Sequence, residues 1–207
     1  MKKMKIKLLI ILLLFPSFLF GFRFINNESP QEILTLFEAY EFARTFLPHD
    51  YEFRIIDITS QDLVITNFPE DDIGIDGRKR YWVVLFSKVD TKYAAHILIR
   101  NGLLYSLDWR RNNFNGIESL FAPEDLILDS PEALQLAIKF ANEQGQEFLP
   151  AKEWAFGHHF VLQMNFCDQT GTYIPIFDVT GADKFGNFSR LWINLRTLDM
   201  LYINNFQ

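Results

Sequence analysis

The feature that most restricts the fold of this chain is a helical segment followed by strand-like runs, which occurs twice. Residues 38–43 (EAYEFA) align with residues 132–137 (EALQLA), 94 positions later. Residues 97–100 (ILIR) resemble residues 191–194 (LWIN), at the far end of the second half. We interpret the two halves as copies of one unit. A helix followed by hairpin-connected strands indicates an antiparallel sheet with the helix packed on one face.

Both expected helices have recognisable ends. Thr35 and Glu38 form a capping box, apolar residues at helical spacing follow to Leu47, and Pro48 ends the first helix. An earlier start at residues 29–30 (SP) is the alternative. The second helix is expected to begin with Ser130 as its cap and to end at Gly145. A short helical turn is expected after the proline at position 123.

Strand-like runs follow each helix. The turn Asn101-Gly102 joins two of them and is the strongest hairpin signal in the chain. After the first helix we expect strands at 51–58, 63–68, 81–88, 93–100 and 103–109, and after the second at 154–166, 173–179, 188–195 and 200–203. The predicted class is α+β, with a first helix-plus-sheet repeat at 22–111, a linker at 112–129 that contains the short helical turn, and a second repeat at 130–207.

The first 21 residues have the pattern of a secretory signal peptide. Four lysines precede an apolar run from Leu8 to Phe20, which proline interrupts and which is shorter than a membrane-spanning helix. We therefore expect export to the periplasm or the extracellular space, with an uncleaved signal as the alternative and the one route to a membrane. Removing residues 1–21 would lower the formal net charge from −6 to about −10. Such a charge argues against a nucleic-acid partner.

The repeated helix-and-strand unit resembles the PepSY domain, which occurs in secreted and envelope proteins and in the propeptides of secreted metallopeptidases, often in tandem. The residues that carry the resemblance are Glu38-Ala39 with Ala43, Glu132-Ala133 with Ala137, the strand opening at 81–84 (YWVV) and the closing turn at 196–199 (RTLD). The resemblance implies a non-catalytic module that binds or restrains another protein, such as a peptidase. A cystatin-like fold is the second choice.

Few residues are arranged for chemistry. His158 and His159 are adjacent, so on a strand their rings point to opposite faces, and we expect His158 to be a satisfied core histidine. Glu70, Asp71 and Asp72 do not match a calcium loop and predict a solvated turn. Cys167, the only cysteine, is expected to be a buried or half-buried apolar residue. We expect no catalytic, cofactor-binding or metal-binding residues.

The function that these features favour is an exported, non-catalytic binding module that modulates a peptidase or an envelope assembly. Its partner-binding surface is predicted to include Trp109, Arg110, Arg111 and Trp192, because aromatic residues are enriched at interface hot spots. The alternative is a carrier for an apolar small molecule held between helix and sheet. An enzyme whose site combines separated residues is a third hypothesis, with His159, Asp168 and Asp178 as examples. The binding-module interpretation depends on paired sheets whose apolar faces cover each other, and a single undivided sheet, or polar groups gathered round a deep hollow, would overturn that interpretation.

Overall fold

The computed structural model describes residues 32–61, 74–111, 117–151, 157–168 and 170–205. These all belong to one compact unit, Gln31–Gln207, and the preceding unit, Met1–Pro30, lies outside the described residues. The expected signal peptide, the expected strand at 63–68, the acidic residues 70–72 and the start of the strand expected at 154 also fall outside them.

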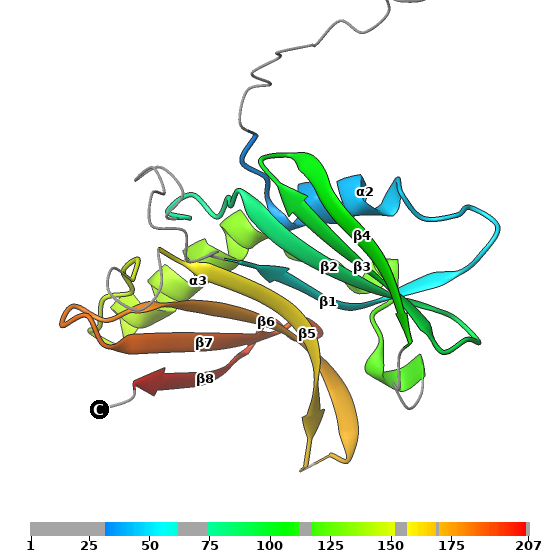
Figure 1. Cartoon of the computed structure of the whole chain (residues 1–207). Coiled ribbons are helices and arrows are strands. Elements are labelled where there is room, and N and C mark those ends of the chain that lie inside the picture. Colours follow the sequence, from blue (N-terminus) through cyan, green and yellow to red (C-terminus); the bar gives the residue numbers. More distant parts are fainter. Residues whose placement is uncertain (1–31, 62–73, 112–116, 152–156, 169, 206–207) are drawn as a thin grey trace, which may run out of the picture. The chain divides into compact units, whose positions relative to one another are not determined.

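The described part contains two α-helices and eight strands (Figure 1). The helices are α2 (Leu36–Arg44) and α3 (Ser130–Glu143), and two short 3-10 helices, η2 (Ile117–Ser119) and η3 (Pro123–Asp125), precede α3. The strands are β1 (Phe53–Ser60), β2 (Tyr81–Lys88), β3 (Tyr93–Arg100), β4 (Leu103–Arg111), β5 (His159–Cys167), β6 (Thr172–Ala182), β7 (Phe188–Asn194) and β8 (Met200–Asn205).

All eight strands form one antiparallel sheet in the order β4-β3-β2-β1-β5-β6-β7-β8. The two halves of the chain meet where β1 pairs with β5, in the register Asp57–Gln163, Ile58–Leu162 and Thr59–Val161. The α+β class is therefore confirmed. The expectation of two sheets that cover each other is wrong, because the halves join edge to edge through backbone hydrogen bonds.

Both helices cover the same face of this sheet and lie behind it in Figure 1. The row of directly opposed residues that runs across this face is apolar, and none of its side chains is more than 1% exposed. Its members are Ile97, Val84, Ile58, Leu162, Phe177 and Ile193. This row forms the centre of a core that α2 and α3 complete with Leu36, Ala39, Ala133 and Leu134.

The two helices meet at their N-termini. Thr35 and Glu38 form the expected capping box of α2. The sequence predicted Ser130 as the cap of α3, and this prediction is wrong. Asp129 is the N-cap, and its Oδ1 accepts hydrogen bonds from the amides of Ser130 and Phe37. Ser130 is fully buried, and its Oγ accepts a hydrogen bond of 2.9 Å from the amide of Leu36. The N-cap residue of α3 therefore also accepts a hydrogen bond from a backbone amide in the first turn of α2.

The turn between β3 and β4 confirms the hairpin signal. Asn101 and Gly102 have φ of +52° and +72°, the left-handed conformations that a tight two-residue hairpin requires. The predicted limits of β2 and β3 are those observed. The short helical turn after position 123 is present as η3, and Gly145, with φ of +70°, follows α3 as predicted.

Candidate functional site

The four residues predicted to bind a partner lie at two separate places. Trp109, Arg110 and Arg111 are exposed on the edge strand β4, whereas Trp192 is half-buried on β7. Six strand intervals separate β4 from β7, which corresponds to about 29 Å at the usual strand spacing. Trp109 packs against Phe53, with ring centroids 6.0 Å apart. The structure therefore does not bring these residues together in one patch.

The face of the sheet opposite the helices is a larger candidate surface. Side chains that alternate with the core row point to this face, because successive residues on a strand point to opposite sides. Two adjacent rows of opposed residues cross it, and most of their side chains are half-buried or exposed. The first row is Ser106, Leu98, Val83, Thr59, Val161, Asp178 and Trp192, and the second is Asp108, His96, Leu85, Asp57, Gln163, Ile176 and Asn194. We call these two rows the open face.

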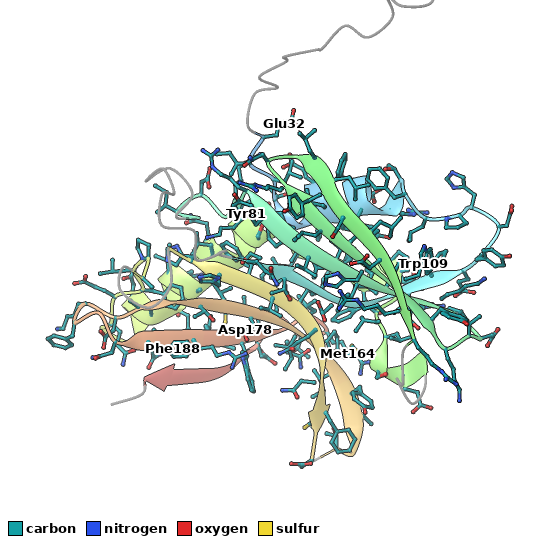
Figure 2. All side chains as sticks on the ribbon, in the orientation of Figure 1. Glu32, Tyr81, Trp109, Met164, Asp178 and Phe188 are labelled. Carbon is teal, nitrogen blue, oxygen red and sulfur yellow. The ribbon has the colours of Figure 1, made fainter. Side chains whose placement is uncertain are left out.

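A polar cluster on the second half of the open face is organised around Asp178, which Figure 2 labels. This carboxylate is 1% exposed and forms an ion pair with Arg190. Its Oδ2 also accepts a hydrogen bond of 3.1 Å from the indole Nε1 of Trp192, and its Oδ1 accepts one of 3.3 Å from Thr180. The guanidinium of Arg190 lies 5.1 Å from the Trp192 ring centroid. The aromatic surface of Trp192 is thus held in a fixed orientation.

Asp57 lies at the centre of the open face, on β1 at the seam between the halves. Its neighbours across the strands are Leu85 and Gln163, and Thr59 donates a hydrogen bond of 3.3 Å to its Oδ1. Burial raises the pKa of Asp57 to about 6, and the hydrogen bond from Thr59 opposes this only in part. Among the described residues no cation contributes to the pKa of Asp57, so they leave the carboxylate incompletely compensated in its ionised form.

The histidines do not form a metal site. His158 is 2% exposed and stacks on Phe148, with ring centroids 5.4 Å apart. It is a core histidine as predicted. Neither ring nitrogen meets strict hydrogen-bond geometry among the described residues, but the backbone of Gly74 is close enough to oppose the effect of burial on the pKa of His158. Burial lowers its pKa to about 4. Within the described ranges no group of three or more histidine, cysteine or acidic residues could hold a metal ion.

The three residues of the enzyme hypothesis do not all converge. His159 and Asp178 are diagonal neighbours on adjacent strands, with Thr180 directly opposite His159 and Asp178 opposite Val161. Asp168 follows the far end of β5, about 30 Å from His159 along an extended strand of nine residues. Asp178 is already occupied by Arg190 and Trp192. Cys167 is half-buried, consistent with the expectation for it.

Sequence reasoning missed Asp57 as a candidate site residue and considered Asp178 only for catalysis. A usable signal was present in both cases, because each aspartate interrupts an apolar strand, in Ile56-Asp57-Ile58 and in Phe177-Asp178-Val179. Carboxylates are depleted in strands, so a carboxylate between apolar neighbours indicates a position whose side chain makes a specific polar contact or is available to make one.

Comparison with known protein families, characterised proteins and solved structures finds no match to this chain. Among the helices of the described part, none has the length and apolar character needed to cross a membrane. The PepSY resemblance therefore remains a sequence-based expectation.

Proposed function

We propose that this chain is an exported, non-catalytic binding module that holds a protein partner on the open face of its sheet. The observation that carries the proposal is that neither α2 nor α3 covers this face, which presents half-exposed aromatic, aliphatic and charged side chains. The expected basis for a binding module, two sheets that cover each other, is absent. Because the halves join edge to edge instead, one face of the eight-stranded sheet is not covered by α2 or α3.

The chemistry of the open face favours a partner with a basic side chain at its centre. None of the described cations acts on the pKa of Asp57, and a lysine or arginine from the partner would supply a compensating charge. Trp192, fixed by Asp178, would provide an aromatic contact on the same face. Tryptophan and charged pairs that become desolvated on binding are typical of interface hot spots. A peptidase restrained by the module is one such partner, as the PepSY resemblance implies.

We also propose that the sheet arose from two copies of one unit, 22–111 and 130–207. The element order is the same in both halves, a helix followed by four antiparallel strands. The N-caps Thr35 and Asp129 are 94 residues apart, which is the spacing of the aligned helices. The register shifts at Leu98/Ile99 and Trp192/Ile193 have the same spacing. These three coincidences support duplication beyond a chance similarity of sequence.

The carrier of an apolar molecule is the weaker alternative. The core row between helices and sheet is filled, with no side chain more than 1% exposed. A pocket does lie between α2 and the sheet, but Arg44, Glu52, Arg54 and Glu124 contribute to its lining. Charged walls do not favour an apolar ligand.

Site-specific photocrosslinking would test the binding module. A photoreactive amino acid at Thr59 or Gln163 on the open face should give a discrete adduct in cells that express the full chain. The same group at Gln135 or Lys139, on the exposed side of α3, is the matched control and should give none. Asp57→Lys should abolish the adduct through charge repulsion. Adducts of equal strength from both faces, or from neither, would refute the proposal.

A further inference from the structure

A pocket of about 330 Å³ lies at the C-terminal end of α2, away from the rows that define the open face. Its walls come from the last turn of α2, from residues 47–54 that lead into β1, and from η3. The deepest side chains are Tyr40, Leu47 and Phe86, which are 4%, 6% and 2% exposed. The rings of Tyr40 and Phe86 are 5.9 Å apart. The pocket therefore has an aromatic floor and a volume at the small end of the range for ligand sites.

Four charged residues contribute to the pocket lining, and two of them neutralise each other. Arg54 donates from Nε to Glu52 Oε1 at 2.9 Å, and this pair forms a salt bridge. Arg44 and Glu124 are exposed, and neither has an ion-pair partner within 4.0 Å among the described residues. One cation on the helix wall and one anion on the η3 wall thus have no ion-pair partner in the described part of the chain, and both line the pocket.

Tyr40, Arg44 and Glu124 line the same pocket, and both charges act on the Tyr40 hydroxyl. Burial raises the pKa of Tyr40, the guanidinium of Arg44 opposes this, and the carboxylates of Glu41 and Glu124 add to it. The charges of Arg44 and Glu124 are therefore close enough to the floor of the pocket to act on the same phenol. Arg44 is also the last residue of α2, where its own positive charge complements the helix carbonyls.

We propose that this pocket binds a free amino acid with an aromatic or large apolar side chain. The carboxylate would accept hydrogen bonds from Arg44, and the ammonium group would pair with Glu124. The side chain would rest on Tyr40 and Phe86. This ligand class matches the two opposite unpaired charges, the aromatic floor and the small volume together. It does not depend on the open face, so either proposal can fail without the other.

Three probes separate the contributions: L-phenylalanine, 3-phenylpropionate, which lacks the ammonium group, and 2-phenylethylamine, which lacks the carboxylate. Chemical-shift titration of protein purified after expression of the full chain should place the shifts at the pocket residues. L-Phenylalanine should bind about tenfold more tightly than either half-probe, as expected for loss of one charge-assisted hydrogen bond.

Two variants cross-check these roles, and both positions are exposed, so folding should be retained. Arg44→Gln should weaken L-phenylalanine and 3-phenylpropionate about tenfold and leave 2-phenylethylamine unchanged, whereas Glu124→Gln should do the reverse for the half-probes. Arg111→Gln and Glu118→Gln, exposed charge changes outside the pocket lining, should alter nothing. Absence of saturable shifts at millimolar probe concentrations would overturn the proposal. Equal weakening of all three probes by Arg44→Gln would also overturn it, because a structural role would then explain the effect.

Discussion

Replacing Asp57 by asparagine should stabilise the protein at neutral pH. The ordinary pKa of this carboxyl is near 3.8 and burial raises it to about 6, so the folded protein binds the proton more tightly than the unfolded chain. Such a group contributes full stability below pH 4, and that contribution is lost as the pH rises to about 6. Since one pKa unit corresponds to about 1.4 kcal/mol, the loss amounts to about 3 kcal/mol at most. Partial exposure of the side chain reduces it to about 1–3 kcal/mol.

Asparagine preserves the shape of the side chain and an oxygen that can accept the hydrogen bond from Thr59, but it carries no charge. Urea unfolding at pH 4, 5, 6 and 7 should therefore show the wild-type protein losing stability relative to Asp57→Asn between pH 4 and pH 6, with a constant difference above that. Asp108→Asn, an exposed change in the same row of the open face, is the control and should show no such difference. A variant that is less stable than wild type at pH 7, or a difference that does not depend on pH, would refute the reasoning.

Three further predictions concern buried polar groups. Because burial lowers the pKa of His158 to about 4, the wild-type protein should lose stability relative to His158→Phe as the pH falls below about 6.5, by about 3 kcal/mol at pH 4, and unfolding experiments on both proteins at pH 7 and pH 4.5 would measure this difference. Ser130→Ala should cost about 1–3 kcal/mol in chemical unfolding, because the buried amide of Leu36 loses its acceptor; an unchanged midpoint would contradict the observed junction of the two helices. Asp178→Ala should lower the free energy of unfolding by about 2–3 kcal/mol, which is less than for breaking a fully buried ion pair, because Arg190 can reach water. The fluorescence of Trp192 should shift to the red in this variant, and unaltered fluorescence would argue against the cluster.

Local structure was predictable where the chain carries its own signals. The limits of β2 and β3 follow from apolar runs bounded by polar residues and by the Asn101-Gly102 turn. The capping box at Thr35 follows from spacing alone. The role of Ser130 was not predictable in this way, because its partner is the amide of Leu36, 94 residues earlier. A serine before a proline has the same local pattern whether it caps its own helix or serves another.

The joining of the two halves into one sheet was beyond sequence reasoning for a related reason. The pairing of β1 with β5 is made by backbone groups, which every residue has, so an edge that pairs within the chain resembles an edge that is left free. The sequence does contain one sign that the strand at the seam has a face without a helix over it in the described part. Asp57 interrupts an apolar strand at the seam, where a strand buried on both faces would have an apolar residue.

The position of Asp57 at the seam connects the fold to the proposed function. A carboxylate that lowers stability at neutral pH is expected to persist only where something else compensates it, and nothing on β2 or β5 opposite it does so. A partner cation over Asp57 would lower its pKa towards the ordinary range, so binding near pH 5 must release a proton and must weaken as the pH falls below about 6. Measuring the affinity of the crosslinked partner between pH 5 and pH 7.5 would check this. A loss of affinity that persists unchanged in Asp57→Asn would assign the pH dependence to another group and remove Asp57 from the interface.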